Sequence, residues 1–143
     1  MEVVPFTIEH FDALELKPGS PVSRERRPLF EIFAKAGPAR TMFDGDLVIG
    51  CSGILCGAWK GIGEVWSIPS VHVPKYPKSV YKEAMIFINE SIEALDLYRL
   101  HTTIREEDTT AIRWIEKLGF QREGLMRQFG PWKENHYMYA RII

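Results

Sequence analysis

Residues 64–104, EVWSIPSVHVPKYPKSVYKEAMIFINESIEALDLYRLHTTI, contain the changes of pattern that decide the fold. Residues 64–71 have the composition of a short strand, and residues 98–104 have that of a second one. Between them, over 78–95, apolar residues recur at helical spacing along two neighbouring stripes, which predicts a helix packed on a sheet. A long helix between two strands indicates a right-handed crossover, so we expect the two strands to be parallel.

The chain before this unit predicts, in order, a strand at 2–6, helices at 8–16 and 24–36, and antiparallel strands at 39–43 and 47–59. Thr7 and Ser23 are suited to cap the two helices, and Pro28 predicts an irregular first turn in the second. Asp44-Gly45 predicts a hairpin between the two strands. Glycines inside the second strand predict a bulge or a bend there.

The chain after the unit predicts a short helix and a closing hairpin. Asp108 is placed to cap a helix over 109–118, which ends at Gly119 in a Schellman motif. Alternating residues at 120–129 and 136–143 then predict the last two strands. The whole order predicts one domain, residues 1–143, of the α/β (α+β) class, with a mixed sheet that is antiparallel except at one parallel pair and flanking helices.

Composition narrows the range of partners. The chain has 143 residues with 18 basic and 19 acidic side chains, and this balance argues against a nucleic-acid binder. The two cysteines suggest ordinary thiols of a cytoplasmic protein, and we predict no metal site. Because the N-terminus lacks a basic segment and no apolar run approaches about 20 residues, we expect neither a signal peptide nor a membrane partner.

The order of elements, together with DTTAIRWIEKLGFQREG at 108–124, resembles the GNAT superfamily of acyl-CoA N-acyltransferases. The late motif of that family has a capping polar residue, an alanine three residues on, and an ending EKLGF; Asp108, Ala111 and residues 116–120 stand at those places. The tail from 119 to 142 is similar to the ribosomal-protein acetyltransferase branch. Together with EVW and RWIEKLGF it looks closer still to small GNAT-like proteins of phages and prophages, some of them virion proteins.

The resemblance implies that acetyl-CoA binds where the strands at 64–71 and 98–104 splay apart. Backbone groups of the first strand would pair with the pantetheine, and amides at the start of the next helix would hold the pyrophosphate. The cofactor-binding residues implied are Ser70, Val71, Val73, Tyr76, Lys78, Ser79, Val80, Asp108 and Arg113. Ser67 is a further candidate donor to the thioester or the pantetheine.

The pyrophosphate loop departs from the family pattern. Where the family has Gln or Arg and then two small residues, this chain has Tyr76, Ser79 and Tyr81. Glycines let a backbone approach a phosphate closely, so their absence removes that contact. Lysines and Ser79 supply charge and a donor instead, and Pro77 suits a first helical turn. The stretch is therefore interpreted either as a CoA-binding loop or as a proline-stiffened turn with solvated lysines.

The catalytic residues are also only partly matched. The position of the family's acidic tyrosine is held by Ile115. Glu64 and His101 are the candidate general bases, and each has an alternative reading as an ordinary strand residue. The arginines of residues 23–28 would line the acceptor site and favour an acidic acceptor, or they form a solvated helix start.

The leading hypothesis is an acyl-CoA-dependent N-acyltransferase in which an amine attacks acetyl-CoA directly with the help of a general base. The acceptor would be a small-molecule or a protein amine, and a homodimer is left open. The alternative is a catalytically degenerate GNAT-fold protein of a phage or prophage, associated with virion proteins, with weak or no CoA binding. A third reading is a CoA-binding module without turnover.

Overall fold

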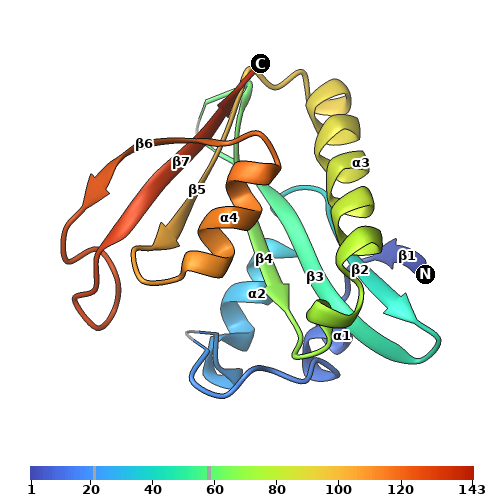
Figure 1. Ribbon diagram of the computed structural model, residues 1–143. Helices are drawn as coiled ribbons and strands as arrows, with labels where there is room; N and C mark the ends of the chain where they lie inside the picture. Colours follow the sequence, from blue (N-terminus) through green and yellow to red (C-terminus); the bar gives the residue numbers. More distant parts are fainter. Residues whose placement is uncertain (21, 58) are drawn as a thin grey trace.

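The computed structural model describes residues 1–20, 22–57 and 59–143. In chain order the elements are β1 (Glu2–Pro5), α1 (Ile8–Asp12), the 3₁₀ helix η1 (Arg24–Arg26), α2 (Arg27–Phe33), β2 (Ala39–Asp44), β3 (Leu47–Cys56), β4 (Ile62–Pro69), the 3₁₀ helix η2 (Val73–Lys75), α3 (Pro77–Leu95), β5 (Arg99–Arg105), α4 (Thr109–Lys117), β6 (Gln121–Met126) and β7 (His136–Ile142). Within the described residues the strands form one seven-stranded sheet in the order β1-β2-β3-β4-β5-β7-β6 (Figure 1). Only β4 and β5 pair in parallel, which confirms the expected mixed sheet.

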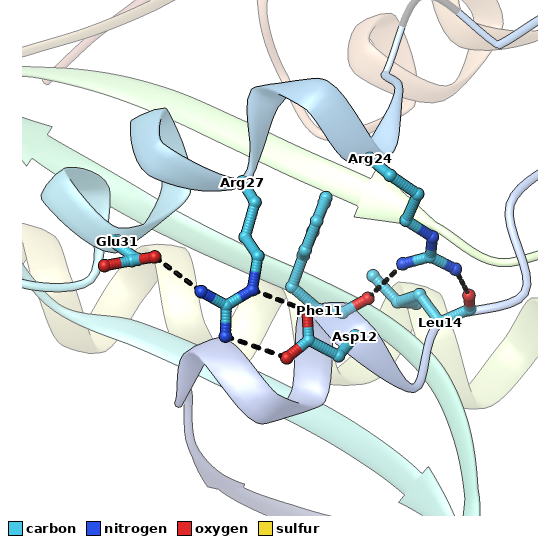
Figure 2. Close-up of polar contacts among 6 residues, drawn as sticks. All are labelled: Phe11, Asp12, Leu14, Arg24, Arg27 and Glu31. Atoms are coloured by element: carbon cyan, nitrogen blue, oxygen red, sulfur yellow. Dashed lines mark hydrogen bonds and ion pairs between the residues drawn. The ribbon is translucent and has the colours of Figure 1, made fainter.

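The first helix is shorter than expected, and the prediction of a helix to residue 16 is wrong. Helix α1 ends at Asp12, because the Arg24 guanidinium donates hydrogen bonds to the carbonyl oxygens of Phe11 and Leu14 (Figure 2). A side chain from a later segment thus satisfies carbonyl groups that a longer helix would have used. The irregular start of the second helix is confirmed, since η1 precedes α2 and Pro28 lies in the first turn of α2. Ser23 precedes η1 but makes no capping side-chain hydrogen bond in the described residues, and the helix expected to reach residue 36 ends at Phe33.

The local signals of α4 and β3 are confirmed. The Asp108 carboxylate accepts a hydrogen bond from the Ala111 N–H at 3.0 Å, as a cap of α4 should. Gly119 has φ +90°, and the Phe120 N–H donates to the Ile115 carbonyl at 3.2 Å, which confirms the Schellman ending. The β2–β3 register shifts opposite Gly50, so the expected bulge is present too.

Two apolar cores lie on opposite faces of the sheet. One is formed beneath α1 and α2, where Phe11 stacks on Phe30 with ring centroids 5.1 Å apart. The other lies beneath α3 and α4 and surrounds Leu100 and the fully buried Tyr139. Figure 1 shows α3 and α4 in front of the sheet and α1 and α2 behind it. Both faces of β4 are therefore covered, which holds this strand in place at the candidate site.

In the described part of the chain the two cysteines form no disulfide bond. Cys51 is buried and Cys56 is exposed, and both are free thiols. Burial raises the pKa of the Cys51 thiol to about 12. None of the helices in the described residues has the length and apolar character needed to cross a bilayer.

Two exposed carboxylates should make the free energy of unfolding depend on pH in the acid range. Hydrogen bonds from Arg27 lower the pKa of Asp12 from its ordinary 3.8, and hydrogen bonds from Arg99 lower the pKa of Glu123 from 4.5. Because the unfolded chain binds these protons more readily, their contribution is complete above about pH 5 and is lost as pH falls through the lower, folded-state values. We expect the free energy of unfolding in urea to fall below that pH.

The matched test replaces Asp12 by Asn and Glu123 by Gln in the same chain. The double variant should show a flatter dependence of the free energy of unfolding on pH between 5 and 3, and added salt should flatten the wild-type curve in the same direction. An unchanged slope in the double variant would show that other carboxylates carry the acid sensitivity.

Candidate functional site

The strands β4 and β5 pair over only three positions and then separate. The partners are Ile62 with Arg99, Gly63 with Leu100 and Glu64 with His101. Beyond them β4 runs on to Pro69 beside β3, while β5 runs on to Arg105 beside β7. Figure 1 shows the two arrows diverging toward their carboxyl ends, with α4 in front of the opening. The splay expected from the sequence is therefore present.

Backbone groups of β4 face the splay at alternate residues. The Ser70 N–H donates to the Ile49 carbonyl, on the side of β3. Because the backbone groups of a strand alternate in direction, those of Val65 and Ser67 face β5. The Val65 carbonyl accepts a hydrogen bond from the Thr102 hydroxyl at 2.9 Å. The N–H and C=O of Ser67, one step further on, face the open part of the splay.

Glu64 and His101 form the last pair before the splay, and their environments differ. Glu64 is exposed, and no hydrogen bond involves its carboxylate within the described residues. His101 is half-buried, and its Nδ1 accepts a hydrogen bond from the Arg99 Nε at 3.4 Å. A neutral ring that accepts at Nδ1 carries its hydrogen on Nε2, so it is a hydrogen-bond donor at that atom. Of the two candidate bases, only Glu64 is free to accept a proton.

Arg99 and Thr102 were not among the predicted site residues, although they lie two residues before and one residue after His101. Arg99 forms a two-bond ion pair with Glu123 at 2.6 and 2.9 Å, which fixes the guanidinium that orients His101. The signal was present in the strand period, because residues 99 and 101 of one strand point to the same face. The role of Thr102 had no such signal, since it depends on the distance between two strands.

The loop between β4 and α3 uses most of its N–H groups internally. Those of Val71, His72, Val73, Lys75 and Tyr76 donate to Glu15 O, Ser70 Oγ, Ser70 O, His72 O and Val73 O, respectively. Pro74 and Pro77 have no N–H, and helical bonding begins with Val80 N–H to Tyr76 O. Within the described residues, the N–H groups of Lys78 and Ser79 are the ones of this stretch that find no protein acceptor. They lie at the positive end of a 19-residue helix.

The predicted cofactor-binding residues divide into two groups. Lys78, Ser79 and Val80 lie together in the first turn of α3. The remaining loop residues are engaged elsewhere or half-buried: Ser70 is buried and bonded within the loop, Val71 and Val73 are half-buried, and the Tyr76 hydroxyl donates to Asp44 Oδ2 at 2.6 Å. That hydrogen bond raises the pKa of Tyr76.

On the other side of the splay, helix α4 contributes a cap and an aromatic contact. Asp108 caps α4, and Arg113 is exposed on its outer face. The Trp114 ring meets the Tyr81 ring of α3 edge to face with centroids 6.1 Å apart, and the Lys117 Nζ lies 4.7 Å from the Tyr81 centroid. Tyr81 therefore leans on α4, and the two helices are bridged by aromatic side chains.

Two of the three arginines expected at the acceptor site are bound to helix α1. Arg24 donates to carbonyl oxygens at the end of α1, and Arg27 binds Asp12 at 2.7 and 2.9 Å and Glu31 at 2.6 Å (Figure 2). Only Arg26 remains exposed without such a contact in the described residues. The arrangement gives no reason to expect an acidic acceptor.

Two hollows of the surface are lined mainly by residues of β6, β7 and the segment between them. One of about 660 Å³ is lined by Arg127, Gln128 and Asn135, and a smaller one runs along β6 and β7. In residues 1–20, 22–57 and 59–143, no three His, Cys, Asp or Glu side chains are grouped to hold a metal ion.

These groups fit the two ends of acyl-CoA unequally. The pantetheine carries amides, and the Ser67 backbone offers one donor and one acceptor facing the splay. The pyrophosphate is an anion, and the start of α3 offers two amides, the helix dipole and the Lys78 ammonium. The site therefore fits acyl-CoA with a smaller set of phosphate-binding amides than a glycine-rich loop supplies.

No protein-family model and no curated protein matches the sequence, but solved structures match its fold. The ribosomal-protein-alanine N-acetyltransferase from Brucella melitensis superposes with a TM-score of 0.75 at 15% identity, covering 100% of both chains. An IAA acetyltransferase from Bacillus cereus gives 0.75 at 13% identity over 99% of each chain. A GNAT-family acetyltransferase from Bacillus anthracis gives 0.73 at 15% identity, covering 98% of this chain and 93% of that one.

These similarities show that the chain has the GNAT fold, as the sequence predicted. At such low identity they show the fold and not the reaction. The expected link to phage and prophage proteins receives no support from them.

Proposed function

We propose that the protein is an acyl-CoA-dependent N-acyltransferase that moves the acetyl group of acetyl-CoA to an amine. The observation that carries the proposal is the splayed β4–β5 pair, which ends in the exposed Glu64 carboxylate next to strand backbone groups that face the opening. Structures of the same fold include enzymes named as acetyltransferases, and this supports the choice of reaction.

Binding would be divided between β4 and α3. The Ser67 backbone would pair with the pantetheine, and the Lys78 and Ser79 amides would hold the pyrophosphate. When bound, acetyl-CoA supplies an acyl thioester that is activated toward attack by an amine. The other loop residues expected as ligands, Ser70 and Tyr76, would act by shaping the loop.

Glu64 would take up the proton, and His101 would stabilise the leaving thiolate. Glu64 takes a proton from the acceptor ammonium, directly or through a water molecule, and so yields the neutral amine that attacks. Ile115 is buried and apolar and provides no acid where the family has its tyrosine. His101, whose neutral ring carries a hydrogen on Nε2, is the hydrogen-bond donor that we assign to the departing thiolate, which takes its proton from solvent. The acceptor is a small-molecule or protein amine.

Acetyl-CoA is expected to raise the melting temperature. At a concentration of 100 Kd a ligand adds about 2.7 kcal/mol to the free energy of unfolding, which corresponds to several degrees for a domain of this size. Ser79→Pro should reduce the shift, because it removes one of the two free amides at a position of the first helical turn where proline is tolerated. Ser79→Ala, which keeps the amide, should leave most of the shift.

Absence of a shift at millimolar acetyl-CoA would overturn the proposed function. It would leave the alternative of a GNAT-fold protein with weak or no CoA binding. A shift that Ser79→Pro does not reduce would move the pyrophosphate away from the start of α3.

A further inference from the structure

Side chains from two other parts of the chain hold the loop between β4 and α3. The His72 Nε2 lies 2.7 Å from Glu15 Oε2, in the segment that follows α1. The Tyr76 hydroxyl lies 2.6 Å from Asp44 Oδ2, at the end of β2. Glu15 also accepts the Val71 N–H with its carbonyl oxygen at 3.0 Å. The loop is thus attached at both ends to elements that are distant in sequence.

The two contacts flank η2 and come directly before the helix that offers the free amides. His72 precedes η2 and Tyr76 follows it, so the contacts are four residues apart along the loop. Pro74 and Pro77 restrict the backbone between and after them, and no glycine lies in residues 70–84. With so little backbone freedom, the side chains of His72 and Tyr76 set where the first turn of α3 lies.

Both carboxylates lie on the outside of the loop. The Glu15 side chain is 67% exposed while that of His72 is 18% exposed, so the imidazole is the inner partner of this pair. Asp44 is likewise exposed at the β2–β3 turn. A carboxylate would repel a phosphate that it faced directly. The Glu15 and Asp44 carboxylates contact the ends of the His72 and Tyr76 side chains, so they can stabilise the loop without contacting the phosphates themselves.

We infer that His72 and Tyr76 are positioning residues for the CoA pyrophosphate. Their side chains hold the loop so that the Lys78 and Ser79 N–H groups are directed at the pyrophosphate. A glycine-rich loop would reach the same result by wrapping its backbone around the phosphates. The inference rests on the proposed function, because it names how the same site holds its anionic end. It assigns no contact between either side chain and the ligand.

The test compares three probes on three variants and a control by titration calorimetry or NMR. His72→Ala and Tyr76→Phe should each weaken binding of CoA and of 3′-phospho-ADP about tenfold, a factor expected when one charge-assisted hydrogen bond that orders a site is lost. S-acetylpantetheine, which lacks the pyrophosphate, should bind all forms equally. His72→Gln keeps a side-chain donor for Glu15 and should restore most of the affinity.

Tyr98→Phe is the matched control, since Tyr98 is 54% exposed and its hydroxyl has no hydrogen bond within the described residues. Equal weakening of all three probes would overturn the inference in favour of a general loosening of the fold. Unchanged CoA binding in both variants would overturn the inference and leave the proposed function intact. If the wild-type chain binds neither CoA nor acetylpantetheine, the proposed function falls, and the inference falls with it.

Discussion

Replacing Glu64 by Gln is expected to lower kcat/KM for amine acetylation by roughly 10²- to 10³-fold, the usual contribution of one general base. Glutamine keeps the size and the exposed position of the side chain but cannot take a proton from an ammonium group. Glu64 is the group for this role because it ends the β4–β5 pairing and has no partner among the described side chains. His101, the other candidate, already accepts a hydrogen bond at Nδ1.

The measurement is a pH profile of kcat/KM with a primary amine as acceptor. Glu64→Gln should lower kcat/KM at every pH of the wild-type profile. Glu93→Gln, which changes an exposed carboxylate near the far end of α3, should leave both rate and profile unchanged. A Glu64→Gln enzyme with more than half the wild-type activity would exclude Glu64 as the base.

Replacing Trp66 by Ala is expected to lower the free energy of unfolding by about 3–5 kcal/mol, the range measured for large aromatic residues in protein cores. The Trp66 ring is 8% exposed and packs against Phe6, Phe30 and Phe33 with centroids 5.4, 5.6 and 5.8 Å away. It also covers Gly53, where an added Cβ would lie 2.6 Å from the ring. Alanine would leave a cavity between the sheet and the helices α1 and α2.

Urea denaturation followed by circular dichroism measures this loss. Trp132→Ala is the control, because Trp132 is 61% exposed, and it should change stability by no more than about 0.5 kcal/mol. Trp66→Phe should cost less than alanine, since a phenyl ring fills more of the gap and the buried Trp66 Nε1 has no hydrogen-bond partner to lose within the described residues. A loss below about 1 kcal/mol for Trp66→Ala would mean that the aromatic core can collapse around the gap.

The elements that the sequence predicted best are those stabilised by neighbours in the chain. The cap at Asp108 and the ending at Gly119 each need a partner only a few residues away, so their residue types identify them. The parallel pair follows from the long helix that joins its strands. Among the candidate site residues, Glu64 followed from the family resemblance and His101 from its place on the later strand, and the structure pairs the two.

What the sequence missed depends on side chains that meet across long separations. Helix α1 ends early because Arg24 reaches back to its carbonyl groups, and no local pattern signals that contact. The bridge between Tyr81 and Trp114 likewise joins two helices. A long side chain can reach many possible partners, and which one it contacts is fixed only by the packing of the folded chain.

The sequence by itself determined the order of strands and helices, the parallel pair and the absence of glycine from the loop before α3, because strand and helix periods and turn residues act locally. The GNAT fold and the splay were implied by the resemblance of these elements and of the late motif to that superfamily. The tertiary structure alone decided which amides of that loop remain free. Val71 gives its N–H to Glu15, and four further loop residues give theirs within the loop, so among the described residues of this stretch the N–H groups of Lys78 and Ser79 are left without a protein acceptor. Whether a backbone N–H lacks an acceptor within the protein is known only when the positions of all nearby acceptors are known, and these positions are set by the folded chain.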